Sequence, residues 1–370
     1  MFKLAWRNLL HERARLIISV GGVALAVMLI LLMAGIFAGS EEHAVAYIKR
    51  QPADLWLMQD GVENLHMSSS LLPPQVVEDV RGIAGVYQAV GLLYSTGAVD
   101  LGETEVYSYI FAVEKGAPFG GPWDLMEGAG SPGIDEVILD SDLAARYGLG
   151  LGDTVDLLGK QLRIAGLSEG TFGIATSITF VNKQTLAGLM GVPPDAASYV
   201  LIRPESDADR VQVADRLKEA IPEANLMTRE AFVASDQEMI RQMGADVIRA
   251  MNSVAYVVGL LVIALTVYTA TVERAREYGV LKAIGADTAL LMRVVAAQAF
   301  ISSGFGFLVG IPLAYGIGAL ITTLLPEMLI VIEPDNLLGQ VPVLLAITAA
   351  ASLLPLGRII RLDPMTVFKG

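Results

Sequence analysis

The chain of 370 residues contains no cysteine and only three histidines. The absence of cysteine excludes disulfide bonds, cysteine-ligated zinc, iron–sulfur clusters and thiol catalysis. The histidines, at positions 11, 43 and 66, are scattered, and none has a partner at the spacing of metal ligands. No G-x-x-x-x-G-K-[ST] motif is present, so the sequence has no phosphate-binding loop. We therefore predict no catalytic, cofactor-binding or metal-binding residues in this chain.

Charge is also scarce. Charged residues make up 18% of the chain, against about 25% in a typical soluble protein, and hydrophobic residues make up 54%. Four stretches of at least 22 residues contain no charged side chain. A transmembrane helix needs about 20 apolar residues, so each stretch is long enough to span a membrane. This excludes a wholly soluble protein and a bundle of six or more spans. The stretches are Leu16–Ser40, Ala250–Val272, Val294–Pro326 and Asn336–Gly357.

The charges between these stretches are segregated by sign. Three short segments, 1–15, 273–293 and 358–370, together carry 11 basic and five acidic residues. Segment 41–249 carries 15 basic and 31 acidic residues, and the gap 327–335 carries only three acidic residues. Short loops rich in Lys and Arg stay on the cytoplasmic side of a membrane. We therefore predict that both termini and the 273–293 loop are cytoplasmic and that 41–249 is extracytoplasmic. The net charge of −13 argues against nucleic acid as a partner.

A cleaved signal peptide is the alternative interpretation of the first stretch. The apolar core of a signal peptide is about 7–15 residues long. Leu16–Ser40 contains 25 residues and follows an arm of 15. This length favours a retained span. The arm itself predicts an interfacial helix, because Phe2 and Trp6 share one helical face and Lys3 and Arg7 share the other.

Segment 41–249 has the pattern of a mixed α/β domain. A glycine- and proline-rich loop at Lys115–Ser131 and the pair Pro193–Pro194 predict the connections between two subdomains. Runs rich in β-branched and aromatic residues predict strands at Ala53–Met58, Thr104–Val113, Glu136–Leu139, Thr154–Leu158, Gln161–Leu167, Ser177–Val181 and Tyr199–Arg203. Helices are predicted at Pro74–Ile83, at Ser141–Tyr147 with Ser141 as N-cap, at Lys183–Met190 after Asn182, and at Asp207–Ala220.

The predicted fold is an α-helical membrane protein with four transmembrane helices in a one-plus-three arrangement. A large extracytoplasmic mixed α/β domain of two subdomains is inserted between helices 1 and 2. The predicted boundaries are an amphipathic interfacial helix 1–15, transmembrane helices 16–40, 250–272, 294–326 and 336–357, the extracytoplasmic domain 41–249, a cytoplasmic coupling loop 273–293, an extracytoplasmic loop 327–335 and a cytoplasmic tail 358–370.

Small residues in the first span predict a helix–helix contact. Gly21, Gly22 and Gly35 allow another helix to approach closely, and close packing is the main gain available to helices in lipid. We predict that they lie at the interface of a dimer. The four stretches contain no Asp, Glu, Lys or Arg, which weighs against an ion-coupled carrier.

The residues after the second stretch, ERAREYGVLKAIGA at Glu273–Ala286, resemble the cytoplasmic loop of FtsX-like, MacB-type permeases of the type VII ABC transporter superfamily. Three further segments fit in order: Leu4–Leu10, Ile138–Gly166 and Arg361–Phe368. Within this family, Tyr278 and the segment Met227–Phe232 are similar to the corresponding residues of the heterocyst glycolipid-exporter branch.

The resemblance implies that the chain pairs with a second permease copy or paralogue and with a separate ABC ATPase subunit, which binds ATP and Mg. A periplasmic adaptor and membrane lipid are further expected partners, in the cytoplasmic (inner) membrane of a prokaryote. The loop helix would contact the ATPase, with Leu281, Ile284 and Leu290 in a groove, Glu273 and Glu277 against a basic rim, and Gly285 ending the helix. The full set predicted for coupling is Glu273, Arg276, Glu277, Tyr278, Gly279, Leu281, Lys282, Ile284 and Gly285.

The predicted function is that of a non-catalytic permease subunit. It would couple ATP hydrolysis by its partner to movement of the extracytoplasmic domain and export an amphiphilic substrate, such as a lipid, glycolipid, peptide or hydrophobic drug. The alternative is a signalling module that uses the same movement to switch on a cell-wall hydrolase or a sensor without transport. The sequence leaves both open.

Overall fold

The computed structural model describes residues 13–360 except 103, 174–175, 207–209, 326 and 333. Most of the expected interfacial helix 1–15 and of the expected tail 358–370 lies outside the described residues. The chain divides into two compact units. The helical unit contains the chain up to Gly39, then Gly244–Leu324 and the chain from Ile330 onward. The sheet unit contains Ser40–Met243 and Leu325–Leu329.

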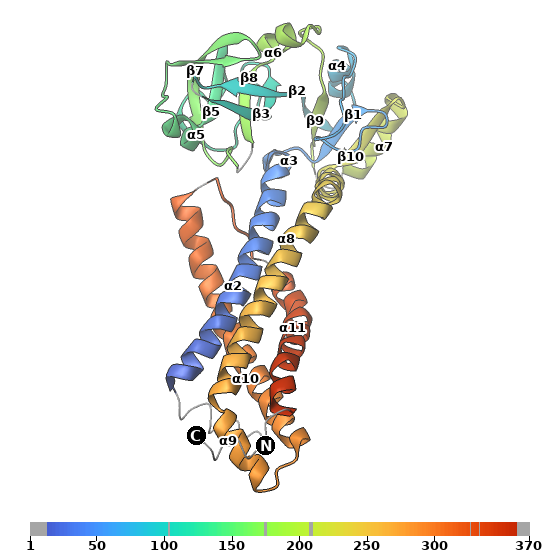
Figure 1. Ribbon diagram of the computed structural model, residues 1–370. Coiled ribbons are helices and arrows are strands. Elements are labelled where there is room, and N and C mark those ends of the chain that lie inside the picture. The colour runs from blue at the N-terminus through green and yellow to red at the C-terminus, as the bar shows by residue number, and fades with distance from the viewer. Residues whose placement is uncertain are drawn as a thin grey trace. The chain divides into compact units, whose positions relative to one another are not determined.

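Long helices make up most of the helical unit (Figure 1). Within the described residues, three helical stretches, Val20–Ala44, Ser253–Glu273 and Thr288–Leu324, are long and apolar enough to cross a membrane. They coincide with the first three predicted spans. The fourth predicted span falls in the last helix, whose apolar stretch is the shorter Val341–Ala351. The helices are α2 (Arg13–Ala44), α8 (Arg229–Glu273), α9 (Ala275–Ala283), α10 (Thr288–Leu324) and α11 (Pro334–Ile360).

Glycines let α2 pack closely against two other helices. A Cβ built on Gly306 of α10 would lie only 2.4 Å from the Cβ of Val23, and one built on Gly310 would lie 2.8 Å from the carbonyl oxygen of Ala24. On the neighbouring α8, a Cβ at Gly259 would be 3.5 Å from Ile30. The close helix contacts of the helical unit therefore depend on glycines, which have no side chain, as expected for helices that associate in lipid.

The sheet unit is built on ten strands and short helices (Figure 1). The strands are β1 (Leu55–Gln59), β2 (Val86–Asp100), β3 (Glu105–Val113), β4 (Leu125–Gly128), β5 (Glu136–Asp140), β6 (Thr154–Leu157), β7 (Lys160–Ser168), β8 (Ser177–Asn182), β9 (Tyr199–Pro204) and β10 (Ala224–Thr228). The helices are α3 (Ala46–Arg50), α4 (Val76–Arg81), α5 (Ser141–Arg146), α6 (Lys183–Met190) and α7 (Arg210–Ala220).

The long strand β2 joins the two halves of this sheet. The order is β10-β1-β9-β2-β3-β8-β5-β7-β4, and β6 pairs with β2 and β7. The first part of β2, up to Leu92, pairs with β9, and the part from Leu93 onward pairs with β3. The β3–β8 and β5–β7 pairs are parallel. Because both halves share β2, the chain passes from one to the other inside a strand.

Three hydrophobic clusters hold the sheet unit. One contains the aromatic side chains Tyr47, Trp56, Phe111, Phe180 and Phe232, and the rings of Tyr47 and Phe111 stack at a centroid distance of 3.6 Å. A second fills the half built from β3, β5, β7 and β8, and the third packs α4 and α7 against β1, β2 and β9. These cores explain why the short elements are ordered, since isolated helices of this length are marginal in water.

All seven predicted strands and all four predicted short helices are present in the sheet unit, with small shifts at their ends. One cap was wrong. The N-cap of α5 is Asp140 rather than Ser141, because the buried Asp140 carboxylate accepts hydrogen bonds from the backbone N–H groups of Asp142 and Leu143 at 2.9 and 3.3 Å. The same carboxylate accepts from the N–H and hydroxyl of Thr171, both at 2.8 Å.

The Lys115–Ser131 loop does not connect the halves as predicted, since its two ends join β3 and β5, which lie in the same half. Its glycines instead approach α3. The Tyr47 hydroxyl donates to the Gly120 carbonyl at 2.7 Å, and the Gln51 side chain bonds to Gly120 N at 2.8 Å and to Gly121 O at 3.0 Å. The other predicted connection, at Pro193–Pro194, does lie on the path from α6 to β9.

The packing of α2 against α10 predicts that Gly306→Ala destabilises the chain. Both Gly306→Ala and the control Gly304→Ala should gain about 1 kcal/mol of helix propensity. A Cβ at Gly304 has no described atom within 4 Å, whereas one at Gly306 overlaps Val23. We expect a net loss of about 1–3 kcal/mol for Gly306→Ala alone, from overpacking. Thermal unfolding of both variants in detergent measures the difference, and equal midpoints would contradict this packing.

Candidate functional site

The predicted coupling loop contains a short helix, α9, set between two long ones. It follows α8 after the single residue Arg274, whose φ of −95° and ψ of 6° break the helix. It ends at Ala283, and Gly285 then adopts a φ of +98°, a conformation that favours glycine. The N–H of Ala286 donates to the Leu281 carbonyl at 2.9 Å, which satisfies one of the open carbonyls at the helix end. The glycine therefore reverses the chain between α9 and α10.

One face of α9 packs inside the helical unit. Tyr278 is 3% exposed and belongs to the same cluster as Leu291 and Val295 of α10. Its hydroxyl lies 3.1 Å from Oε1 of Gln298, to which it donates. A tyrosine phenol is protonated at neutral pH in any case, and burial raises the pKa of Tyr278 further. Gly279 is also buried. Tyr278 therefore anchors α9 on α10, and both residues are buried within this chain.

The opposite face of α9 is exposed and apolar. Glu277, Val280, Leu281 and Ile284 lie at spacings of three, four and seven residues, which places them on one side of a helix. Ile284 is 75% exposed and Leu281 is 37% exposed, and Leu290 at the start of α10 is exposed to the same extent as Leu281. Single exposed leucines are ordinary, but several exposed apolar residues on one helix face make this face a candidate interaction surface.

The remaining residues predicted for coupling, apart from Gly285, are charged and differ in exposure. Glu273 is the last residue of α8 and is exposed, Arg276 is exposed, and Lys282 is half-buried. The structure therefore separates the predicted set into an exposed face and a supporting face.

The N-terminal part of α8 is held firmly in the sheet unit. Phe232 is fully buried in the aromatic cluster. Asp236 is also fully buried, and its carboxylate accepts from Leu65 N at 3.0 Å and lies 2.7 Å from Nδ1 of His66. One turn further on, Arg241 pairs with Glu41 at 3.1 Å. The sequence did not predict the contacts of Asp236 and Arg241, because their partners lie 170 or more residues away along the chain.

A second anchor joins the segment between α10 and α11 to the sheet unit. Leu325–Leu329 belongs to that unit, and Oε1 of Glu327 accepts from the Arg146 guanidinium at 2.6 Å. The Glu327 side chain is 11% exposed, and Arg146 also lies over the ring of Phe172 at 5.2 Å. The Arg146 side chain is 42% exposed, so solvent screens the pair in part, and loss of Arg146 would leave the less exposed Glu327 carboxylate without this hydrogen bond.

The three glycines predicted for a dimer interface lie in different surroundings. A Cβ on Gly22 would be 2.8 Å from Oγ1 of Thr266 in α8, and one on Gly35 would be 2.9 Å from Ile330 of the same chain. Around Gly21 no described atom lies within 4 Å of that position. Gly22 and Gly35 therefore serve contacts within the chain, and Gly21 is the glycine that leaves an open face.

The described part of the chain contains no group of three or more His, Asp or Glu residues that could hold a metal ion.

The comparisons with known proteins cover the whole chain. Residues 16–220 match the family model of the MacB-like periplasmic core domain, and residues 249–364 match that of the FtsX-like permease C-terminal region. The chain is 25% identical over 382 residues to an uncharacterized ABC transporter permease of Mycobacterium tuberculosis, with 100% of both chains covered. It is 27% identical over 220 residues to the macrolide export ATP-binding/permease protein MacB of Agrobacterium fabrum, which covers 57% of this chain and 34% of that protein.

Among solved structures, the periplasmic region of MacB from Actinobacillus actinomycetemcomitans matches with a TM-score of 0.38 and 10% identity, over 50% of this chain and 92% of that one. The periplasmic core match alone covers more than half of the chain, and the permease match accounts for most of the rest. The chain therefore belongs to the ABC transporter permeases that combine a MacB-like periplasmic core domain with an FtsX-like permease C-terminal region.

Proposed function

We propose that α9 docks on a separate ATPase subunit and that α8 carries the resulting movement to the sheet unit, so that the chain drives export. The exposed face of α9 is the observation that carries this proposal. Its apolar residues Val280, Leu281 and Ile284 lie beside the exposed charges of Arg276 and Glu277. An apolar centre with a charged rim is the usual composition of a protein interface.

Almost all of the chain between this face and the sheet unit is helical. Only Arg274 separates α9 from α8. The helix α8 is 45 residues long, or about 68 Å at 1.5 Å per residue. Its first residues are fixed in the sheet unit by Phe232, Asp236 and Arg241. A displacement imposed on α9 would therefore reach the sheet unit without passing through a flexible loop.

We propose an amphiphilic substrate, such as a lipid, glycolipid, peptide or hydrophobic drug. The four uncharged stretches offer no ionised group that could line a polar channel. This favours capture from the lipid or from the outer surface over passage through a pore. The name of the Agrobacterium relative, a macrolide exporter, fits a substrate of this class.

A second copy of the chain, or a paralogue, would complete the membrane part. Ile17, Gly21 and Leu25 form an exposed line on α2, and Val257, Leu261 and Leu265 form another on α8. We propose that the face around Gly21 contacts the second chain.

The coupling proposal predicts that changes on the exposed face of α9 uncouple the chain from its ATPase. Glu277→Lys reverses a charge and Leu281→Asp places a carboxylate in the apolar patch. Each should lower ATPase binding at least about tenfold, since mismatched charges at an interface cost several kcal/mol. Co-purification of the ATPase and substrate-stimulated ATP hydrolysis measure the effect. Glu219→Lys, an exposed position on α7, is the matched control and should change neither. Full binding and activity in both α9 variants would refute the coupling role.

The predicted topology can be tested directly because the chain has no cysteine of its own. Ser206→Cys in the sheet unit should react with a membrane-impermeant maleimide on intact spheroplasts. Asp287→Cys, next to α9, should react only after the membrane is opened. If intact spheroplasts instead label Asp287→Cys and not Ser206→Cys, the predicted topology is reversed.

The dimer proposal predicts different effects for two adjacent glycines. Gly21→Leu should reduce crosslinking between copies without lowering thermal stability, because its Cβ meets no described atom of its own chain. Gly22→Leu should lower thermal stability, because its side chain meets Thr266. Unchanged crosslinking in Gly21→Leu would rule out this face as the dimer contact.

A further inference from the structure

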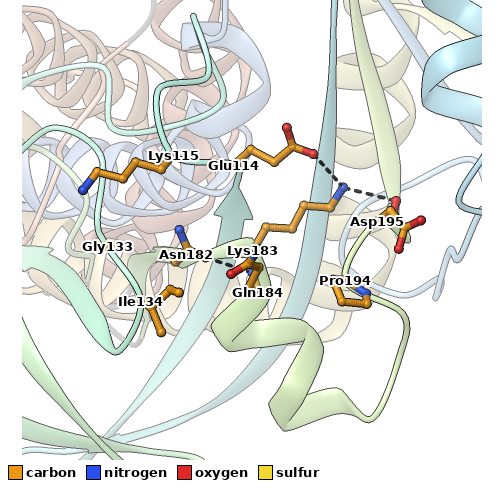
Figure 2. Close-up of a pocket in the computed structure, with 9 residues that line it drawn as sticks. All are labelled: Glu114, Lys115, Gly133, Ile134, Asn182, Lys183, Gln184, Pro194 and Asp195. Carbon is orange, nitrogen blue, oxygen red and sulfur yellow. Dashed lines mark hydrogen bonds and ion pairs between the residues drawn. The ribbon is translucent and has the colours of Figure 1, made fainter.

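A cavity of about 660 Å³ lies in the sheet unit (Figure 2). Four segments meet there: the residues after β3, the residues before β5, the β8–α6 junction and the loop from α6 to β9. This volume falls in the range of about 300–1,000 Å³ that is typical of small-molecule pockets. None of the residues assigned above to coupling lines this cavity.

A buried lysine is the central feature of the cavity. Lys183 is the first residue of α6, and its side chain is only 2% exposed. Its Nζ donates to the carbonyl oxygen of Asp195 at 3.3 Å and lies 3.8 Å from Oε1 of Glu114. Figure 2 shows the ammonium between these two groups. An ammonium has three donor hydrogens, and these two contacts are long, so the group retains capacity for another acceptor.

The carboxylates of Glu114 and Asp195 partly compensate the charge of this lysine, although burial has the larger effect on it. Burial lowers the pKa of Lys183, which is the direction expected when water is removed from a cation. The Glu114 side chain is 62% exposed, so its carboxylate lies largely in solvent and beyond hydrogen-bond distance of Nζ. An oxyanion bound inside the cavity would neutralise the ammonium through a charge-assisted hydrogen bond.

The rest of the lining carries charges of both signs and an apolar part, since the exposed Asp195 adds a second carboxylate beside that of Glu114. The start of α6, where the Asn182 side chain accepts from Gln184 N at 2.9 Å, brings the positive end of a helix to the same wall. Lys115 adds a second, exposed cation. Ile134 and Pro194 are exposed and supply an apolar rim.

We propose that this cavity binds a small ligand through a carboxylate or phosphate group, with Lys183 as its counter-ion. Glu114 competes with the ligand for the ammonium. The ligand oxyanion comes either from a free anion or from a lipid headgroup. The site goes beyond the export function proposed above and does not depend on the contact with the ATPase.

Calorimetric titration of the full-length chain in phosphatidylcholine nanodiscs at pH 6.5 tests the site. The probes are inorganic phosphate, hexanoate and dihexanoyl phosphatidic acid. Tighter binding of the lipid than of phosphate identifies a headgroup site, and equal binding identifies a site for a free anion. Lys183→Met should weaken binding at least about tenfold, the usual effect of losing a hydrogen bond to a charged group. Lys160→Met, which removes a surface cation that pairs with Asp135 outside the cavity, should change nothing.

Glu114→Gln keeps the proposal testable even if Lys183→Met fails to fold, because Glu114 is exposed. Removing the competing carboxylate should strengthen binding by about threefold. The proposal is overturned if no probe binds saturably to the unmodified chain below about 10 mM. It is also overturned if Glu114→Gln binds with unchanged affinity, or if a folded Lys183→Met binds as well as the unmodified chain.

Discussion

The continuity of α8 is the constraint on which the rest of the structure depends. A helix has its backbone hydrogen bonds satisfied along its own length, so it transmits displacement without stretching. In α8 one end is buried in the aromatic cluster at Phe232 and tied to the Leu65–His66 segment by Asp236. The other end stops one residue before α9. Within the helical unit, glycine contacts hold α2 against α8 and α10. Within the sheet unit, the Arg146–Glu327 pair ties down the segment Leu325–Leu329.

The sequence predicted the elements whose local pattern agrees with their surroundings, and it missed those fixed by distant contacts. The longest strand, β2, was not predicted, because Gly91 and Gly97 interrupt its β-branched run. Tertiary packing accounts for Gly91, since a Cβ there would lie 2.8 Å from the buried Val77; at Gly97 a Cβ would lie 2.4 Å from the end of the exposed Leu158 side chain, which would have to move. The helical extension of α8 before Ala250 was missed because charged residues end the apolar run there, although they do not end the helix.

In the candidate site, too, the sequence predicted the features that have a local pattern and missed those that depend on contacts with distant residues. The motif at Glu273–Ala286 located the helix and its terminating glycine correctly. A linear motif does not distinguish the two faces of a helix, so it grouped Tyr278 with Leu281. The structure separates them by burial, since the Tyr278 ring packs on α10 while Leu281 is exposed. The anchors Asp236 and Glu327 gave no signal, because a single carboxylate in a sequence has many possible partners.

The distribution of polar groups between the two units limits where an anionic ligand can be recognised. The four uncharged stretches contain no cation, and burying an unpaired ion among them would be costly. The sheet unit, in contrast, already buries the ammonium of Lys183 beside a cavity, where a sheet core and helix α6 hold its position. A fixed cation that could face an anionic group is therefore available in the sheet unit and absent from the four uncharged stretches.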